Sequence, residues 1–144
     1  DEAHLRQVLP DYDIVIDATD QLENKFLIND VCVSAEKPFV HGGITGFSGQ
    51  VMTYVPEKGP CYRCIFGEVP EDNAPAPIPV IGVTAGIIGT IQAAEAIRYL
   101  LGIPSLLTGK LLVLDGLRMQ FRTVPFPHVS EHCPLHTRKG VTDL

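Results

Sequence analysis

The 144-residue sequence lacks a glycine-rich loop of the form G-x-G-x-x-G. Its nearest approach is Gly43, Gly46 and Gly49, whose spacing does not fit that pattern. Dinucleotide-binding domains use such a loop to hold pyrophosphate at a helix N-terminus. The absence therefore argues against a nicotinamide-dependent oxidoreductase and against phosphate binding by these glycines.

Basic residues and cysteines are also few. Eleven Lys and Arg stand against seventeen Asp and Glu, which gives a net charge of -6 and argues against a nucleic-acid surface. Four cysteines are too few for the disulfide framework of a small secreted domain. The first residues show no basic start followed by an apolar run, so we expect no signal peptide and a reducing, cytoplasmic location.

The stretch of residues 74–94 includes no charged side chain and has the length of a membrane span. Pro75, Pro77 and Pro79 fix its first part in an extended conformation, and the remaining helix is too short to cross about 30 Å of hydrocarbon. We therefore expect an exposed loop followed by a buried helix, and no membrane association.

Length and composition favour one globular α/β domain over residues 1–144, because a hydrophobic content of 45% is enough to fill a core. A helix is expected before Pro10. After it, residues 14–16 form a β-branched run typical of a fully buried parallel strand.

A polar junction follows that strand. Asp20 has the residue type of a helix N-cap, and Glu23 lies three residues on, as in a capping box. Doubly wound sheets bind ligands in the crevice outside the carboxyl ends of their strands, so Asp17, Asp20, Asn24 and Lys25 are expected to surround such a crevice. The alternative is that Asp20 only caps the helix and Lys25 is a solvated surface charge.

Two further strands are expected at residues 39–41 and 49–55, separated by a break at the glycines of 42–46. His41 could face the crevice, but a single His at a strand end is more often structural. Later in the chain, residues 111–116 and 118–124 predict two strands joined by a turn at Asp115 and Gly116.

The helix expected from Val80 to Leu101 has apolar residues at near-helical spacing. Its predicted core face consists of Val83, Ile87, Ile91, Ala94 and Ile97. Gly86 and Gly89 make one side nearly flat, which suits close packing on a sheet or on another helix, including one across a dimer interface.

Two short motifs carry metal-ligand spacing. Cys61 and Cys64 form a C-x-x-C pair, and Cys133 and His136 form a C-x-x-H pair almost seventy residues later. Such pairs are preferred zinc ligands, and the simplest prediction is one shared structural ion with four protein ligands and no open position. A Cys61–Cys64 disulfide, a redox pair or two unrelated buried thiols remain the alternatives.

Several ordered runs in this chain resemble one known family. They are Asp17-Ala18-Thr19-Asp20, Lys25-Phe26-Leu27-Ile28-Asn29-Asp30, His41-Gly42-Gly43-Ile44, Gly49-Gln50-Val51-Met52-Thr53, Cys61-Tyr62-Arg63-Cys64 and Cys133-Pro134. Together they resemble the second half of the ThiF/MoeB/HesA family, relatives of ubiquitin-activating enzymes that adenylate the C-terminal Gly-Gly of a small sulfur-carrier protein. The resemblance implies a Rossmann-like mixed sheet flanked by helices, the C-terminal part of a ThiF-type domain.

For the nucleotide, the resemblance implies that Asp20 is the catalytic carboxylate near ATP and magnesium. Lys25 falls where the family has an Arg or Lys that faces the nucleotide. Gln21, the third residue expected to contact the nucleotide, replaces the more common Asn. Asp20 can hold the magnesium ion that spreads charge over the phosphates while the carrier carboxylate attacks in line.

For the metal, the resemblance assigns Cys61, Cys64 and Cys133 as three zinc ligands, with His136 in place of the usual fourth Cys. The zinc-binding tail is then residues 125–144. Residues 67–80 correspond to the crossover loop, beneath which the carrier's tail passes. That loop contains no Cys here, so a covalent link to the carrier is not expected.

The family's glycine-rich loop and phosphate-binding Arg and Lys precede the part that this chain resembles. We therefore expect a fragment of a larger adenylation domain that alone binds ATP poorly. In the full-length context the expected activity is adenylation of a ubiquitin-like sulfur carrier by a homodimer. The alternative is a non-catalytic, zinc-stabilised module for dimerisation or carrier binding.

Overall fold

The computed structural model describes residues 1–69 and 79–136. The elements in chain order are α1 (Glu2–Val8), the 3-10 turn η1 (Leu9–Asp11), β1 (Val15–Asp17), α2 (Leu22–Ser34), β2 (Phe39–Thr45), β3 (Ser48–Tyr54), α3 (Tyr62–Phe66), α4 (Gly82–Leu100), β4 (Lys110–Asp115) and β5 (Gln120–Pro125). The expected crossover loop and tail fall partly in residues 70–78 and 137–144, which lie outside the described residues.

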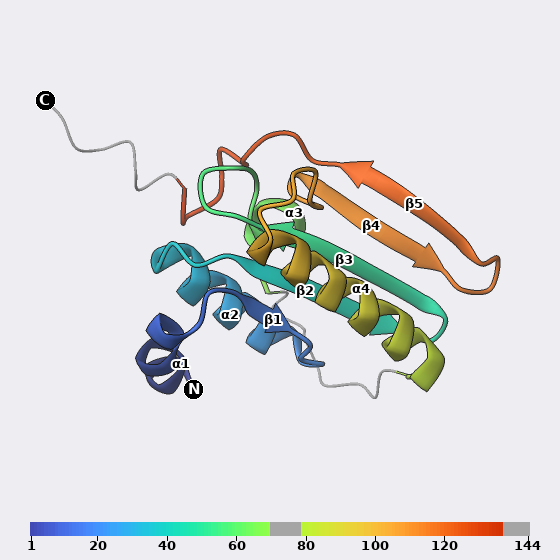
Figure 1. Ribbon diagram of the computed structural model, residues 1–144. Helices are drawn as coiled ribbons and strands as arrows, with labels where there is room; N and C mark the ends of the chain where they lie inside the picture. The colour runs from blue at the N-terminus through green and yellow to red at the C-terminus, as the bar shows by residue number, and fades with distance from the viewer. Residues whose placement is uncertain (70–78, 137–144) are drawn as a thin grey trace, which may run out of the picture.

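The strands form one five-stranded sheet in the order β1-β2-β3-β4-β5 (Figure 1). β1 and β2 are parallel, and each later pair is antiparallel. Helices cover both faces, so the expected mixed sheet flanked by helices is confirmed. Within the described residues, no helix combines the length and the apolar content that a membrane span needs.

The two faces of the sheet carry separate hydrophobic cores. On one face α2 and α3 pack over the strands, and the core includes Phe26, Val31, Phe39, Met52 and Tyr54. On the other face α4 lies across β2 and β3, over a smaller core that includes Val40, Val51, Ile88 and Leu114 (Figure 1). The β1–β2 edge is therefore enclosed between α2 and α4, and this position determines the surroundings of the site.

Three strand predictions need correction. β1 is one residue later than expected and is not fully buried, because it forms one edge of the described sheet and leaves Ile16 46% exposed. β2 is not broken at its glycines but runs on to Thr45, since Gly42 and Gly43 pair with β3. The β4–β5 turn occupies residues 116–119, so β5 begins at Gln120.

The predicted start of α2 is also wrong. Its N-cap is Gln21, without a side-chain cap hydrogen bond, and not Asp20. The first helical bond runs from the Lys25 amide to the Gln21 carbonyl, at 3.3 Å. Asp17 accepts the Thr19 amide just before this point, so a separate turn over residues 17–19 and a bend at Asp20 precede the helix.

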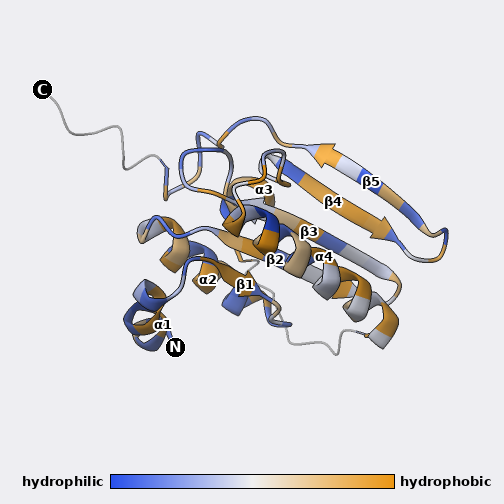
Figure 2. Ribbon diagram, in the orientation of Figure 1, coloured by the Kyte–Doolittle hydropathy of each residue, from blue (hydrophilic) through white to orange (hydrophobic). Residues whose placement is uncertain are grey.

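The predicted core face of α4 is only partly confirmed, because Ile87 and Ile91 pack against the second core whereas Val83, Ala94 and Ile97 are exposed. Its buried residues are Thr84, Ile88, Gln92, Glu95 and Ala96. The polar members can be buried because they bond groups of the sheet and of the loop that follows α4: the Thr84 hydroxyl donates to Gly46 O, and Glu95 accepts the Leu107 amide. Figure 2 shows apolar residues along α4. Some of them lie on its outward side, where Val83 is 71% and Ile97 56% exposed.

Candidate functional site

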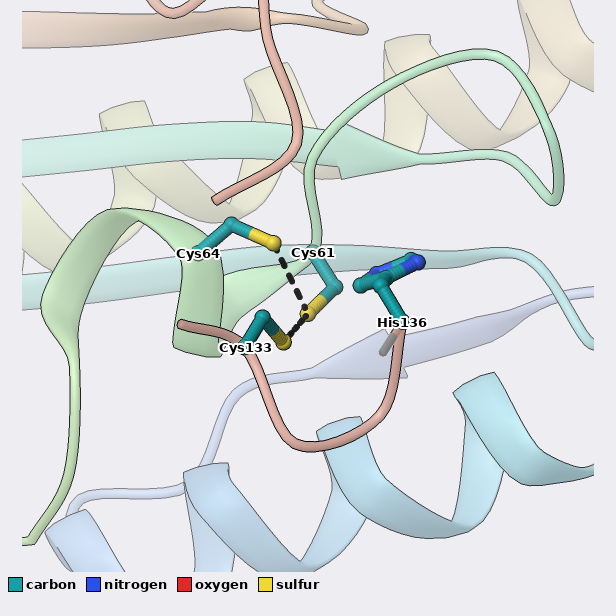
Figure 3. Close-up of side chains that lie close together, drawn as sticks. All are labelled: Cys61, Cys64, Cys133 and His136. Atoms are coloured by element: carbon teal, nitrogen blue, oxygen red, sulfur yellow. Dashed lines mark hydrogen bonds between the residues drawn. The ribbon is translucent and has the colours of Figure 1, made fainter. Parts of the chain in front are cut away.

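The four predicted metal ligands come together although they lie far apart in the sequence (Figure 3). Cys61 and Cys64 belong to the start of α3, and Cys133 and His136 to the segment after β5. Their ligand atoms all lie within 4.8 Å of one another. The Cys61 Sγ is 3.7 Å from the Sγ of Cys64 and 3.7 Å from that of Cys133. These separations exclude a disulfide, in which the sulfurs are about 2 Å apart.

The donor set fits a tetrahedral ion. With metal–sulfur bonds of about 2.3 Å, the sulfurs of a tetrahedral site lie about 3.8 Å apart, close to the distances found here. The Nε2 atom of His136 is buried and has no hydrogen-bond partner, which is costly unless it binds something. Three thiols and one imidazole are a preferred zinc set. The chain therefore has a Cys3His group that could hold a metal ion.

The thiols differ in their electrostatics. The hydrogen bond from Cys61 lowers the pKa of Cys64 to about 5, against the effect of burial. The same bond, together with burial, raises the pKa of Cys61. One thiolate is therefore favoured near neutral pH even before an ion binds, and thiolates are the form that ligates metals.

α2 holds the C-x-x-C helix in place by polar contacts. Asn29 Oδ1 accepts the Tyr62 amide at 2.8 Å. Asp30 forms a two-bond ion pair with Arg63, at 2.6 and 2.7 Å, and the guanidinium lies 4.7 Å from the centre of the Phe26 ring. Sequence reasoning missed these partners; the only signal was that Asn29, Asp30 and Arg63 lie inside the runs that carry the resemblance.

A buried polar cluster lies at the carboxyl end of β1. Asp17, 2% exposed, accepts hydrogen bonds from the Thr19 amide (3.0 Å) and hydroxyl (2.7 Å). His41 Nδ1 lies 2.8 Å from Asp17 Oδ2, and Lys25 Nζ lies 3.2 Å from the same oxygen. Lys25 Nζ also donates to Gly42 O at 2.7 Å. β1, α2 and β2 thus meet at one carboxylate.

The charges in this cluster compensate one another. Burial raises the pKa of Asp17, but its bonds to His41 and Thr19 and the nearby Lys25 outweigh burial and bring the pKa down to about 2. Burial lowers the pKa of His41. Asp17 is therefore ionised and His41 neutral at pH 7, so the imidazole donates from Nδ1. Burial also lowers the pKa of Lys25, which the Asp17 charge opposes.

Aromatic rings cover His41, which is fully buried. The ring centres of Tyr62 and Phe66 lie 4.6 and 6.1 Å from that of His41. Its second nitrogen, Nε2, lies 3.4 Å from Gln50 Nε2. His41 therefore does not face an open crevice, and the structural interpretation of this residue agrees with its position.

The residues expected to contact the nucleotide occupy different environments. Asp20 is exposed at the β1–α2 junction. Gln21 is exposed too, and its side chain accepts a bond from Asn24 at 3.3 Å. Lys25 is only 8% exposed, so the alternative of a solvated surface charge is wrong, and its ammonium group lies on Asp17.

A surface hollow of about 800 Å³ lies away from both clusters. It is located beside the end of α4 and the residues before β1, and its lining includes Asp13, Lys58, Tyr99 and Lys110. None of the predicted site residues contributes to it. The hollow therefore gives no support to either candidate site.

Comparison with known proteins agrees with the arrangement described above. The profile of the ThiF family matches residues 1–135. The SAMP-activating enzyme E1 of Haloferax volcanii is 41% identical over 150 aligned residues, which cover 100% of this chain and 54% of that protein. The adenylyltransferase and sulfurtransferase MOCS3 of Culex quinquefasciatus is 40% identical, over 81% of this chain and 27% of that protein. The chain thus spans about half, or less, of the length of these relatives.

Solved structures show the same fold. E. coli MccB, crystallised with ATP, superposes with a TM-score of 0.77 at 21% identity, over 94% of this chain and 42% of MccB. PaaA superposes with a TM-score of 0.64 at 12% identity, over 88% of this chain and 46% of PaaA. With the fold, the family profile and the 41% identical relative in agreement, the chain belongs to the ThiF family.

Proposed function

We propose that this chain is part of an ATP-dependent adenylyltransferase that activates the C-terminal Gly-Gly carboxylate of a small ubiquitin-like sulfur-carrier protein. The observation that supports it most directly is the 41% identity, along the whole chain, to a SAMP-activating enzyme E1. The exposed Asp20 at the carboxyl end of β1 agrees with this function, because ligands of α/β sheets bind at that edge.

In this proposal Asp20 holds magnesium and is the catalytic carboxylate, with Gln21 and Lys25 at the same junction. Bound magnesium–ATP would supply an electrophilic α-phosphate, to which the carrier carboxylate would bond to form an acyl-adenylate while pyrophosphate is released. The chain's contribution is to fix the exposed carboxylate of Asp20 beside the buried Asp17 cluster, so that the ion is held in a defined position.

The Cys3His cluster is proposed to bind a structural zinc ion. All four ligands come from the protein, so the ion has no open position for substrate and its role is stability. The thiols stay reduced and available in the cytoplasm, where we place the protein.

We further propose a homodimer that uses the outward side of α4. This side has Val83 at 71%, Ile97 at 56% and Leu101 at 69% exposure, and a Cβ added at Gly86 would contact nothing within 4 Å. A flat apolar helix side of this kind favours close packing against a second helix.

The test is pyrophosphate exchange into ATP by the protein as its gene encodes it. We expect exchange only with a carrier that ends in Gly-Gly, and loss of at least about a hundredfold in Asp20→Ala, because the mutation removes the proposed magnesium ligand. Asp13→Ala, which changes an exposed carboxylate before the opposite end of β1, should leave exchange unchanged. Carrier binding without exchange would instead support the non-catalytic module.

A further inference from the structure

The Asp17 carboxylate organises the turn that directly precedes Asp20. Its Oδ1 atom accepts the Thr19 amide at 3.0 Å and the Thr19 hydroxyl at 2.7 Å. A side chain that accepts the amide two residues ahead forms a local turn. Thr19 directly precedes Asp20, so the direction in which Asp20 leaves the sheet depends on these two bonds.

Asp17, at the end of β1, is held by side chains from three other elements. Its Oδ2 lies 2.8 Å from His41 of β2 and 3.2 Å from Lys25 of α2. Its main-chain oxygen, in β1, accepts the side-chain amide of Gln92 of α4 at 2.7 Å. A buried carboxylate with partners on all sides has little freedom to move, because each displacement leaves a buried polar group unpaired.

Lys25 is committed to the same cluster. Its ammonium group contacts both Asp17 oxygens and Gly42 O, and the residue is 8% exposed. To reach a nucleotide outside the sheet it would have to leave Asp17 without its charged partner. Its position is therefore that of a counter-ion to Asp17.

We propose that Asp17 is a positioning residue for adenylation: through Thr19 it sets where Asp20 presents its carboxylate, and Lys25 acts through Asp17. This inference rests on the adenylation function proposed above. It goes beyond that function in two respects. The buried residues Asp17 and Lys25 determine the position of the exposed Asp20 carboxylate, and Lys25 does not contact the nucleotide. Because magnesium requires near-ideal ligand geometry, a displaced Asp20 should raise the magnesium requirement.

The experiment compares the parent protein, as its gene encodes it, with Asp17→Asn, Thr19→Val and the control Thr123→Val. Thr123 is an exposed β5 residue, so the same substitution there changes no part of the cluster. For each protein, the magnesium concentration for half-maximal pyrophosphate exchange and the thermal midpoint are measured. We expect Asp17→Asn to raise the magnesium concentration about tenfold or more, Thr19→Val to raise it several-fold, and Thr123→Val to match the parent.

Thr19→Val keeps the buried charges and therefore tests the turn even where Asp17→Asn fails to fold. A fall in the thermal midpoint of Asp17→Asn and Thr19→Val with an unchanged magnesium requirement would show that Asp17 only stabilises the fold, and would overturn the inference. A merely structural residue has no reason to change the metal dependence of the folded enzyme.

The role of Lys25 is tested by a double-mutant cycle on the affinity for a non-hydrolysable ATP analogue. If Lys25 acts through Asp17, the double variant Asp17→Asn/Lys25→Met should bind the analogue no more weakly than the worse single variant. If Lys25 contacts the nucleotide directly, the two losses should add, and that result would overturn the assignment.

The two proposals fail in different ways. A parent protein without carrier-dependent exchange removes the adenylation function and this inference with it. A parent that exchanges, with Asp20→Ala inactive and with Asp17→Asn and Thr19→Val both equal to the parent, removes this inference alone.

Discussion

His41 is surrounded by groups that oppose its protonation. Burial removes the hydration that an imidazolium needs, and the nearby Lys25 adds repulsion. The bond to Asp17 works in the other direction but is outweighed, so the pKa of His41 stays below its ordinary value. Tyr62 and Phe66 complete the enclosure. A neutral, buried imidazole therefore links folding to pH.

The first prediction follows from that link. Below a pH of about 6.5 His41 becomes protonated in the unfolded chain but stays neutral in the folded chain. Its contribution to the free energy of unfolding is therefore complete above this pH and is lost as the pH falls. Urea unfolding at pH 7.5 and 5.5 should show a larger loss for the parent than for His41→Asn, which keeps a donor to Asp17 but does not titrate. The parent should lose at most about 1.4 kcal/mol more of its free energy of unfolding per pH unit than His41→Asn does. His128→Asn, at an exposed position, should keep the parent's slope, and an equal slope in His41→Asn would contradict the prediction.

At the scale of elements, α4 is joined to the sheet by polar contacts as well as apolar ones. Gln92, 3% exposed, donates to Asp17 O at 2.7 Å and to Val40 O at 3.2 Å. It crosses the strand at Gly42, where a Cβ would lie 2.4 Å from the Gln92 side chain. The contact between α4 and β2 therefore requires glycine at this position.

Gly42→Ala should destabilise the fold by about 1–3 kcal/mol, because Gln92 cannot move away without breaking both of its bonds. In Gly42→Ala/Gln92→Ala the loss should be smaller than the sum of the single losses, as urea unfolding can measure. Gly86→Ala, on the outward side of the same helix, should stabilise the isolated monomer by up to about 1 kcal/mol through helix propensity. Additive losses in the double variant would mean that a Cβ at position 42 does not clash with the Gln92 side chain.

The outward side of α4 gives a second prediction at this scale. Ile97→Lys should convert the proposed homodimer to a monomer, because a charge would be buried without a partner in the interface. Size-exclusion chromatography with light scattering would measure the mass. Leu117→Lys places the same charge at a residue 75% exposed in the β4–β5 turn and should leave the mass unchanged. A mass that Ile97→Lys does not alter would place the interface elsewhere.

The sequence predicts features that depend on neighbouring residues, but not those that depend on contacts between residues far apart in the chain. The spacing of Cys61 and Cys64 indicates a metal half-site by local chemistry alone, and the structure brings it to Cys133. The inward side of α4 is predicted only at Ile87 and Ile91, because burial of Gln92 depends on carbonyl groups of two distant strands. The position of Lys25 likewise depends on Gly42 O, which no local pattern reveals.

At the scale of the whole molecule, the Cys3His cluster joins the middle of the chain to its later part. Cys61 and Cys133 are 72 positions apart, yet their sulfurs lie 3.7 Å from each other. An ion bound there closes a long loop and restricts the unfolded chain, as a disulfide would, an effect of roughly 4 kcal/mol for a loop of this length. The cluster should therefore dominate the stability of the chain.

Metal content and unfolding test this directly. Cys133→Ser and treatment with a chelator should remove the ion and lower the free energy of unfolding by several kcal/mol, about the size of that cross-link effect. His136→Cys should retain one metal ion per chain by elemental analysis, because four thiolates also form a closed zinc site. Cys32→Ala, a buried thiol outside the cluster, should keep the ion. Purified parent protein without bound metal would refute the zinc proposal.

The position of α3 has a wider consequence. This five-residue helix presents Cys64 on one side, while Tyr62 and Phe66 form the roof over His41. A helix so short does not persist in water by itself, so its place depends on what anchors its ends. Withdrawal of the metal or oxidation of the thiols would loosen that roof and let water reach Asp17. Metal starvation or oxidative stress would then weaken the β1–α2 junction, the proposed nucleotide site, without any inhibitor binding there.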